Sequence, residues 1–440
     1  MKVFDDETMA AACRKCHIEA PGDVTIMESA ALAAELENNT GIPVIHMELG
    51  SPGLAPNRIG IEAEKAALDA GKVSGYPPTD GLPVLKQASS RFVKAFLDLD
   101  MEPARCIPTT GSMLGAFAAF AACTQCTPGK NKILVIEPSF SANKQQMAIL
   151  GIPWKGIEIA DCRGPHLEGR LRAEMSDGDI AAIVYSTPNN PSWMCMSEQE
   201  LHTIASVADE YGVAVIEDQA YFCMDFRNSG FDVPYQKPFP PSAARFTGNC
   251  IILLSASKIF SYAGQRIGVM CIGKDLYERR FPALAARYGG TGQFGLTITG
   301  GILDMITSGC TASTQWGLAA MMDASCEGSL NFVRDIHEYS SRAVRMKSIF
   351  ARHGFGITYP EDSRGPVGDG FFFTVSYPGI ASGPLVQELM SYGVSTVSLD
   401  KMGSGRKGVR VCSSRIRDNQ FELLDTRLAE FRKDHPITQQ

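Results

Sequence analysis

The 440-residue sequence has no hydrophobic run long enough to cross a membrane. Its longest apolar stretches, such as 114–123, fall well short of the roughly 20 residues that a membrane-spanning helix needs. The N-terminal segment also lacks the apolar core of a secretory signal. There is no excess of basic residues, since the formal net charge is −7, and this argues against a general nucleic-acid binder. We therefore expect a cytoplasmic protein that binds neither membranes nor nucleic acids.

Disulfide and metal frameworks are not indicated either. The 13 cysteines are odd in number and are scattered through hydrophobic segments, a pattern typical of reduced, buried thiols in a cytoplasmic protein. Two C-x-x-C pairs, Cys13/Cys16 and Cys123/Cys126, are too far apart in the chain to favour a zinc site. We expect no metal. The GTGQFG stretch at 290–295 fits a dinucleotide-binding pattern, but no apolar strand precedes it.

The middle of the chain alternates between short apolar runs and helical patterns. The segment 197–212 has a capping box, Ser197 with Glu200, followed by one apolar face. The apolar runs are rich in Ile and Val and carry no polar alternation, which is typical of strands covered on both faces. This predicts an α/β fold with a mostly parallel central sheet and helices on both faces. The predicted strands are 132–138, 180–188, 212–218, 250–257 and 266–273.

A different pattern begins near Asn331. One long amphipathic helix is predicted over 331–354, followed by strands at 370–378 and 407–414 and by a C-terminal helix over 418–434. These elements indicate a second, smaller α+β domain, with the N-terminal segment packed against it. We therefore divide the chain into a large domain, 55–330, and a small domain formed by 1–54 and 331–440.

Polar and aromatic side chains follow the predicted strands of the large domain. They are Phe140, Asn190, Asp218, Tyr221 and Lys258, and in an open α/β sheet the carboxyl ends of the strands form the ligand site. A helix-opening turn at 109–117 offers backbone N–H groups to a phosphate. Pyridoxal phosphate would use all of these groups: a lysine for its Schiff base, a carboxylate for its ring nitrogen, donors for its phenolic oxygen, a stacking ring and a phosphate cup.

Five motifs in order resemble the class I/II aminotransferases, which are fold-type-I pyridoxal-phosphate enzymes similar to aspartate and aromatic aminotransferases. The resemblance extends from about Met47 to the C-terminus. The motifs are GYPPTDGLPVLKQA (75–88), TPNNPSW (187–193), EDQAY (217–221), SASKIFSYAGQRIG (255–268) and GVRVCSS (408–414).

The resemblance implies a role for each matched residue. Lys258 would form the Schiff base and move the α-proton. Arg410, Gly50 and Asn190 would contact the substrate, with Arg410 holding its α-carboxylate. The cofactor would be held by Asp218 at its ring nitrogen, by Tyr221 and Asn190 at its phenolic oxygen, by Phe140 stacked on its ring, by Gly111, Ser112, Met113, Ser255, Ser257 and Arg266 at its phosphate, and by Tyr76 from the partner subunit of a homodimer.

The resemblance implies a ping-pong aminotransferase that moves an amino group between an amino acid and a 2-oxo acid. A lyase or decarboxylase on the same scaffold remains an alternative, because fold does not fix function. A non-catalytic, cofactor-binding regulator is a third reading. The Asn-Pro turn continues with Ser192-Trp193 where the family has Thr-Gly, and Trp193 would narrow the pocket or reshape the turn. The segment 286–301 has no family match, and Arg58 and Arg287 are candidates for contact with a substrate side chain.

Overall fold

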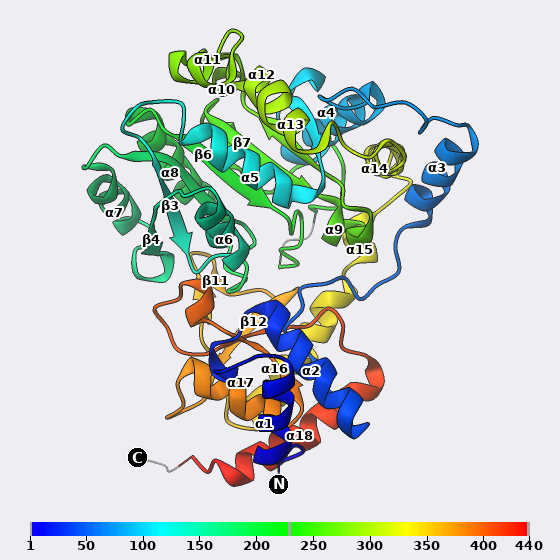
Figure 1. The fold of residues 1–440 in the computed structure, drawn as a ribbon, viewed down its shortest axis with the longest axis vertical. Helices are drawn as coiled ribbons and strands as arrows, with labels where there is room; N and C mark the ends of the chain where they lie inside the picture. Colours follow the sequence, from blue (N-terminus) through cyan, green and yellow to red (C-terminus); the bar gives the residue numbers. More distant parts are fainter. Residues whose placement is uncertain (1, 228–229, 438–440) are drawn as a thin grey trace.

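The computed structural model describes residues 2–227 and 230–437. Figure 1 shows a larger upper part built around a central sheet and a smaller lower part that holds both ends of the chain. Within the described residues, no helix combines the length and the apolarity that crossing a membrane would require.

A seven-stranded sheet forms the core of the larger part, with the strand order β2-β8-β7-β6-β5-β3-β4. Strand β8 is antiparallel to both of its neighbours, and the other strand pairs are parallel. The prediction of a mostly parallel sheet is therefore confirmed. The strands are β2 (Cys106–Thr109), β3 (Lys132–Glu137), β4 (Trp154–Glu158), β5 (Ile180–Ser186), β6 (Ala214–Gln219), β7 (Cys250–Ser255) and β8 (Gly268–Ile272).

Helices cover both faces of this sheet, as the uniformly apolar strands predicted. Neighbouring residues of β5 point to opposite faces: Ile183 packs in one hydrophobic cluster and Val184 in another. The first face is covered by α4 (Pro83–Leu97), α7 (His166–Met175), α8 (Glu198–Glu210) and α14 (Ala312–Cys326), and the second by α5 (Gly111–Cys123), α6 (Ser141–Ile149), α10 (Lys274–Glu278) and α11 (Pro282–Tyr288). The predicted capping box of Ser197 and Glu200 opens α8.

The smaller part holds an antiparallel sheet with the strand order β14-β15-β12-β9, and a separate parallel pair, β1 with β13. Its hydrophobic cluster joins residues from 4–47 with residues from 343–431. The exact domain division at residues 54 and 330 stays a prediction. The elements are β1 (Ile45–His46), β9 (Gly356–Ile357), β12 (Phe372–Ser376), β13 (Val394–Ser395), β14 (Val397–Ser398), β15 (Val409–Cys412), α1 (Asp6–Lys15), α2 (Ile26–Thr40), α17 (Ser382–Ser391) and α18 (Phe421–Asp434).

The long helix predicted over 331–354 is wrong in one respect, because the structure breaks it in two. The pieces are α15 (Phe332–Asp335), capped by the side chain of Asn331, and α16 (Glu338–Arg352). Phe332 of the first piece packs in the core of the larger part, while Met346 of the second piece packs in the core of the smaller part. Tyr339, near the start of α16, lies in the same cluster as Phe332, so α16 itself passes from one core to the other.

The remaining elements are short segments between the layers and at the edges of the two parts. Helix α3 lies at the outer edge of the larger part, where it packs against α14 (Figure 1). These elements are α3 (Arg58–Asp69), α9 (Ala256–Ile259), α12 (Phe294–Leu296), α13 (Asp304–Thr307), a π-helix η6 (Thr297–Leu303), the hairpin of β10 (Glu361–Asp362) and β11 (Gly365–Pro366), and the 3₁₀ turns η1 (Pro21–Asp23), η2 (Pro103–Arg105), η3 (Ile159–Asp161), η4 (Ala243–Arg245), η5 (Ala263–Gln265), η7 (Asp400–Met402) and η8 (Asp418–Gln420).

Candidate active site

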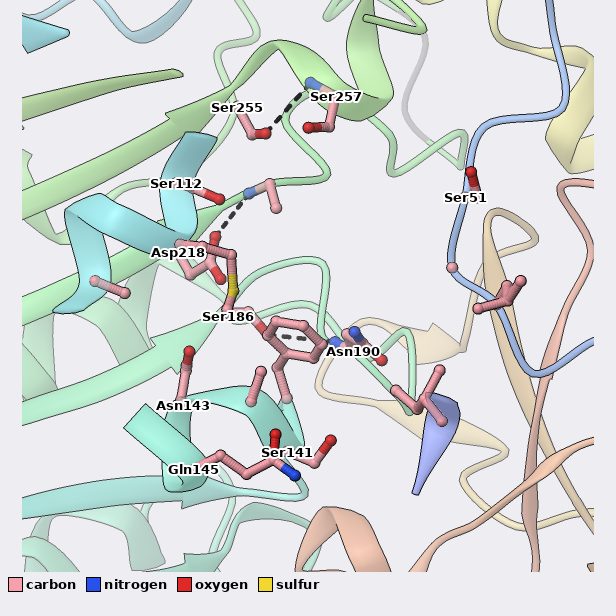
Figure 2. A pocket seen from close by; sticks show the side chains of 18 of the residues that line it. Ser51, Ser112, Ser141, Asn143, Gln145, Ser186, Asn190, Asp218, Ser255 and Ser257 are labelled. Atoms are coloured by element: carbon pink, nitrogen blue, oxygen red, sulfur yellow. Dashed lines mark hydrogen bonds between the residues drawn. The ribbon is translucent and has the colours of Figure 1, made fainter. Parts of the chain in front are cut away.

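A cavity of about 550 Å³ lies at the carboxyl ends of the parallel strands and is closed on one side by residues of the smaller part. Figure 2 shows its polar lining, with Ser255, Ser257, Ser112 and Asp218 gathered near one end. Twelve of the residues singled out from the sequence line this cavity: Gly50, Ser112, Met113, Phe140, Asn190, Asp218, Tyr221, Ser255, Ser257, Lys258, Arg266 and Arg410.

Lys258 lies on α9, the short helix that follows β7 directly. Its Nζ donates a hydrogen bond of 2.5 Å to the carbonyl oxygen of Gly50. Burial lowers the pKa of Lys258 to about 8, against the opposing influence of Cys412 and Asp218. With that pKa, about one amine in ten is uncharged at neutral pH. The partly buried amine is therefore available as a nucleophile or as a base.

Asp218 lies in β6, and its side chain is buried in the cavity wall. Its Oδ1 accepts a hydrogen bond of 3.0 Å from the backbone N–H of Ala220. Burial raises the pKa of Asp218 to about 6, while the Ala220 N–H and the charge of Lys258 act in the opposite direction. Across residues 2–227 and 230–437, no cation lies within ion-pair distance of this carboxylate. The site therefore offers a buried negative charge to a cationic ligand.

An amide and a phenol face each other beside Asp218. Asn190 Nδ2 donates to the Tyr221 hydroxyl at 3.4 Å, and the backbone N–H of Asn190 donates to Ser186 Oγ at 3.2 Å. Burial raises the pKa of Tyr221, so its hydroxyl keeps its proton at neutral pH and can donate it in a hydrogen bond.

Arg410 is buried, with a relative exposure of 1%. Its Nη1 donates to Asn190 Oδ1 at 3.2 Å, its Nη2 donates to the carbonyl oxygen of Glu48, and its guanidinium lies 4.5 Å from the ring centre of Phe372. Its Nε has no hydrogen-bond partner, and in the described part of the chain it forms no ion pair. Burial lowers its pKa. Since a buried guanidinium is costly without a counterion, this position favours an anionic ligand.

A cationic and hydroxylic cup lies at the N-terminus of α5. Ser255 Oγ accepts a hydrogen bond from the Ser257 N–H at 3.3 Å, and both residues line the cavity with Ser112 and Arg266. Gly111 does not line the cavity itself; it lies behind the arginine, and a Cβ at this position would come within 2.5 Å of Arg266 Nη2. Backbone N–H groups at a helix N-terminus, together with a guanidinium and hydroxyls, suit a phosphate.

Tyr76 does not reach the cavity in this chain. It lies between α3 and α4 and has a relative exposure of 91%. Its predicted contact belongs to a partner subunit, so its role stays a prediction.

Trp193 does not line the cavity and has an unusual backbone conformation in the Asn-Pro turn. Its backbone has a φ of +64°, a region that bulky residues rarely occupy. Its ring is fully buried, lies edge-on to Tyr221 with ring centres 5.3 Å apart, and covers Gly370, where a Cβ would come within 2.2 Å of the indole. Trp193 therefore supports Tyr221 from behind.

Neither arginine proposed for a substrate side chain lines the cavity within this chain. Arg58 pairs with Glu62 at 2.5 Å on the exposed side of α3, and Arg287 lies exposed on α11. The segment 286–301 likewise contributes no lining residue. It spans the end of α11, all of α12 and the start of η6, and η6 packs against α5.

Sequence reasoning missed much of the far wall of the cavity. Ser186 ends β5, so inspecting that strand end could have found it. Ala116 and Ala220 lie inside the stretches 109–117 and 217–221 that the sequence analysis singled out. No local signal marks the others, because they come from α2, α6 and the smaller part. The missed lining residues are Thr25, Ile26, Met27, Leu49, Ser51, Ala116, Ser141, Ala142, Asn143, Lys144, Gln145, Ser186, Ala220, Val397 and Lys401.

Comparison with known proteins identifies what this chain resembles. The family profile described as aminotransferase class I and II matches residues 50–361. A probable aspartate aminotransferase from Methanocaldococcus jannaschii is 23% identical over 55% of this chain and 60% of its own length. A probable kynurenine–oxoglutarate transaminase from Saccharomyces cerevisiae is 24% identical over 55% of this chain and 54% of its own length. The matches thus span between about half and three fifths of these relatives.

Among solved structures, a double mutant of Thermus thermophilus aspartate aminotransferase has a TM-score of 0.74 with 19% identity. The match covers 93% of this chain and 96% of that one. At this level of identity the similarity shows the fold, and the shared fold includes both parts of the molecule.

Proposed function

Because this chain belongs to the aminotransferase class I and II family, we propose that it is a pyridoxal-phosphate-dependent aminotransferase. It moves an amino group from an amino acid to a 2-oxo acid in two half-reactions. The observation that carries this proposal is that a partly buried lysine of lowered pKa, Lys258, and a buried carboxylate, Asp218, line one cavity.

The residues of the cavity fit pyridoxal phosphate at each of its functional groups. Arg266, Ser255, Ser257 and the N-terminus of α5 suit the phosphate, and the close approach of Arg266 to Gly111 leaves no room for a side chain there. Asp218 suits the ring nitrogen as a counterion. Asn190, Tyr221 and Phe140 would serve the phenolic oxygen and the ring face, and Met113 would contact the phosphate end with Ser112.

When bound, the cofactor supplies an aldehyde that bonds to amines and a ring that accepts the electrons of a broken Cα bond. The chain supplies the rest. Lys258 Nζ, uncharged in part at neutral pH, would take up the α-proton of the amino acid and hold it beside the substrate. Arg410 binds the α-carboxylate and so fixes the direction of the Cα bonds, while Asn190 orients the guanidinium through its Oδ1.

Tyr76 supports a homodimer within this proposal. With 91% of its surface exposed, the Tyr76 side chain is free to contact another surface. We assign the covering surface to a second copy of the chain, whose phosphate cup the hydroxyl would reach. The cytoplasmic location expected from the sequence stays a prediction.

The test is substitution of Lys258 by Ala. The variant should lose turnover with every amino donor and should no longer become covalently labelled when pyridoxal phosphate and borohydride are added, as read by mass spectrometry. Retention of both properties would refute the proposal. A wild-type enzyme that releases product from one amino acid and returns to its starting absorbance, without a 2-oxo acid, would indicate a lyase or decarboxylase.

A further inference from the structure

Among the described residues of this chain that line the cavity, no cation is left unpaired or unassigned for a second acidic group of a substrate. Five cationic side chains line it: Lys144, Lys258, Arg266, Lys401 and Arg410. Lys144 is paired with Glu137, and both side chains are mostly buried, at 16% and 12% exposure. Lys401 is paired with Asp23 at 2.7 Å in a more exposed ion pair, with side-chain exposures of 32% and 73%. In the proposed function, the other three serve the reacting amine, the phosphate and the α-carboxylate, so every cation among the described lining residues is engaged.

The wall beside the reacting groups is apolar. Leu49 directly precedes Gly50, whose carbonyl oxygen accepts the hydrogen bond of Lys258. Val397 is the direct cross-strand partner of Arg410 between β14 and β15, so their side chains share one face of the sheet. Both apolar residues therefore stand next to the positions where the α-carbon and the α-carboxylate of a substrate would lie.

The first turn of α2 completes this wall at the mouth of the cavity. Ile26 and Met27 line the cavity, and Met27 has a relative exposure of 71%. A flexible, unbranched thioether at a mouth adapts to apolar groups of different shape. The side chain of Thr25 caps the helix and forms a capping box with Glu28. Ile26 and Met27 are therefore the side chains of this turn that are left to face a ligand.

We propose that the amino-acid substrate carries an uncharged, apolar side chain that packs against Ile26, Met27, Leu49 and Val397. This inference rests on the proposed aminotransferase function and specifies its substrate class. A carboxylate in the same place would exchange part of its water for apolar side chains without a free counterion among the described lining residues of this chain, which is costly. An aliphatic or aromatic side chain would instead gain from the apolar area that it buries.

The first experiment compares amino donors on the enzyme loaded with pyridoxal phosphate. Single-turnover absorbance is recorded with leucine, methionine and phenylalanine and with aspartate and glutamate. We expect kcat/KM for the best apolar donor to exceed that for both acidic donors by at least about 100-fold, the scale of an unpaired buried charge. Equal or faster conversion of aspartate or glutamate would overturn the inference, while leaving the aminotransferase proposal intact.

A binding measurement separates this inference from the proposed function. Calorimetry with the loaded enzyme compares 4-methylpentanoate with succinate, two unreactive acids that differ in the group at the far end. Tighter binding of 4-methylpentanoate would support the apolar wall even if the enzyme converted no amino donor. The absence of conversion would refute only the aminotransferase proposal. Tighter binding of succinate would overturn the inference whatever the activity.

A variant that introduces a positive charge tests whether the substrate side chain lies against α2. Met27→Arg places an unpaired cation at the mouth, and the ratio of kcat/KM for aspartate to that for leucine should rise about tenfold. Ile149→Arg is the matched control, since Ile149 is 76% exposed at the end of α6 and does not line the cavity. An equal ratio in both variants would contradict the placement of the substrate side chain against α2.

Discussion

Replacing Asp218 by Asn should stabilise the cofactor-free protein at neutral pH. The carboxylate is buried without a counterion in the described residues, and burial raises its pKa from an ordinary 3.8 to about 6. A shift of about two units corresponds to about 3 kcal/mol of unfavourable free energy when the group is ionised. Asn keeps an oxygen that can accept the Ala220 N–H but carries no charge to desolvate.

The pH dependence of this effect follows from its sign. The folded chain holds the proton of Asp218 more tightly than the unfolded chain. Asp218 therefore lowers the free energy of unfolding progressively as pH rises from about 4 to about 6, and this loss of stability is constant at higher pH. The stabilisation by Asn should therefore be about 3 kcal/mol at pH 8 and about half of that at pH 5.

Urea unfolding of the cofactor-free proteins at pH 8 and pH 5 measures this difference. Asp69→Asn, which removes an exposed carboxylate from α3, is the matched control and should change the free energy of unfolding by less than about 0.5 kcal/mol at both pH values. A stabilisation by Asp218→Asn that does not change with pH, or a loss of stability at pH 8, would refute the idea of a desolvated carboxylate.

Two further predictions concern residues around the reacting groups. Arg410→Lys should raise KM for every amino donor by about 100-fold and lower kcat less, because the lysine side chain lacks the planar guanidinium that binds a carboxylate bidentately. An unchanged KM in steady-state assays would show that Arg410 does not bind the substrate. Trp193→Gly should relieve the strained φ of +64° but remove the ring behind Tyr221, so the free energy of unfolding in urea should fall by about 3 kcal/mol. Trp193→Phe should lose less stability than Trp193→Gly. Equal stability of the wild type and both variants would show that the indole does not support Tyr221.

The strands of the large sheet and the polar residues at their ends could be predicted from the sequence. Their patterns are local: an uninterrupted apolar run such as that before Lys258 predicts a strand covered on both faces, and the residue that follows it must lie at the ligand edge. Asp218 and Asn190 were placed by the same reasoning, and the structure brings all three to one cavity.

The tertiary structure decided the direction of each strand and which remote segments lie close together. Strand β8 is antiparallel to both of its neighbours although its apolar pattern equals that of the parallel strands, because a strand carries no local mark of its direction. The helix predicted over 331–354 is broken between Asp335 and Glu338, and its buried residues are divided between two cores. Periodicity records which residues are buried but not which core buries them.

The sequence by itself determined the reacting centre: a lysine, a carboxylate and a phosphate cup, each set by a short motif. Only the tertiary structure decided what surrounds the substrate. It joins Arg410 to Asn190, 220 positions away in the chain, and it adds Ile26 and Met27 as part of the far wall. These contacts depend on how the smaller part packs against the larger one, and packing between remote segments leaves no periodic trace in either segment.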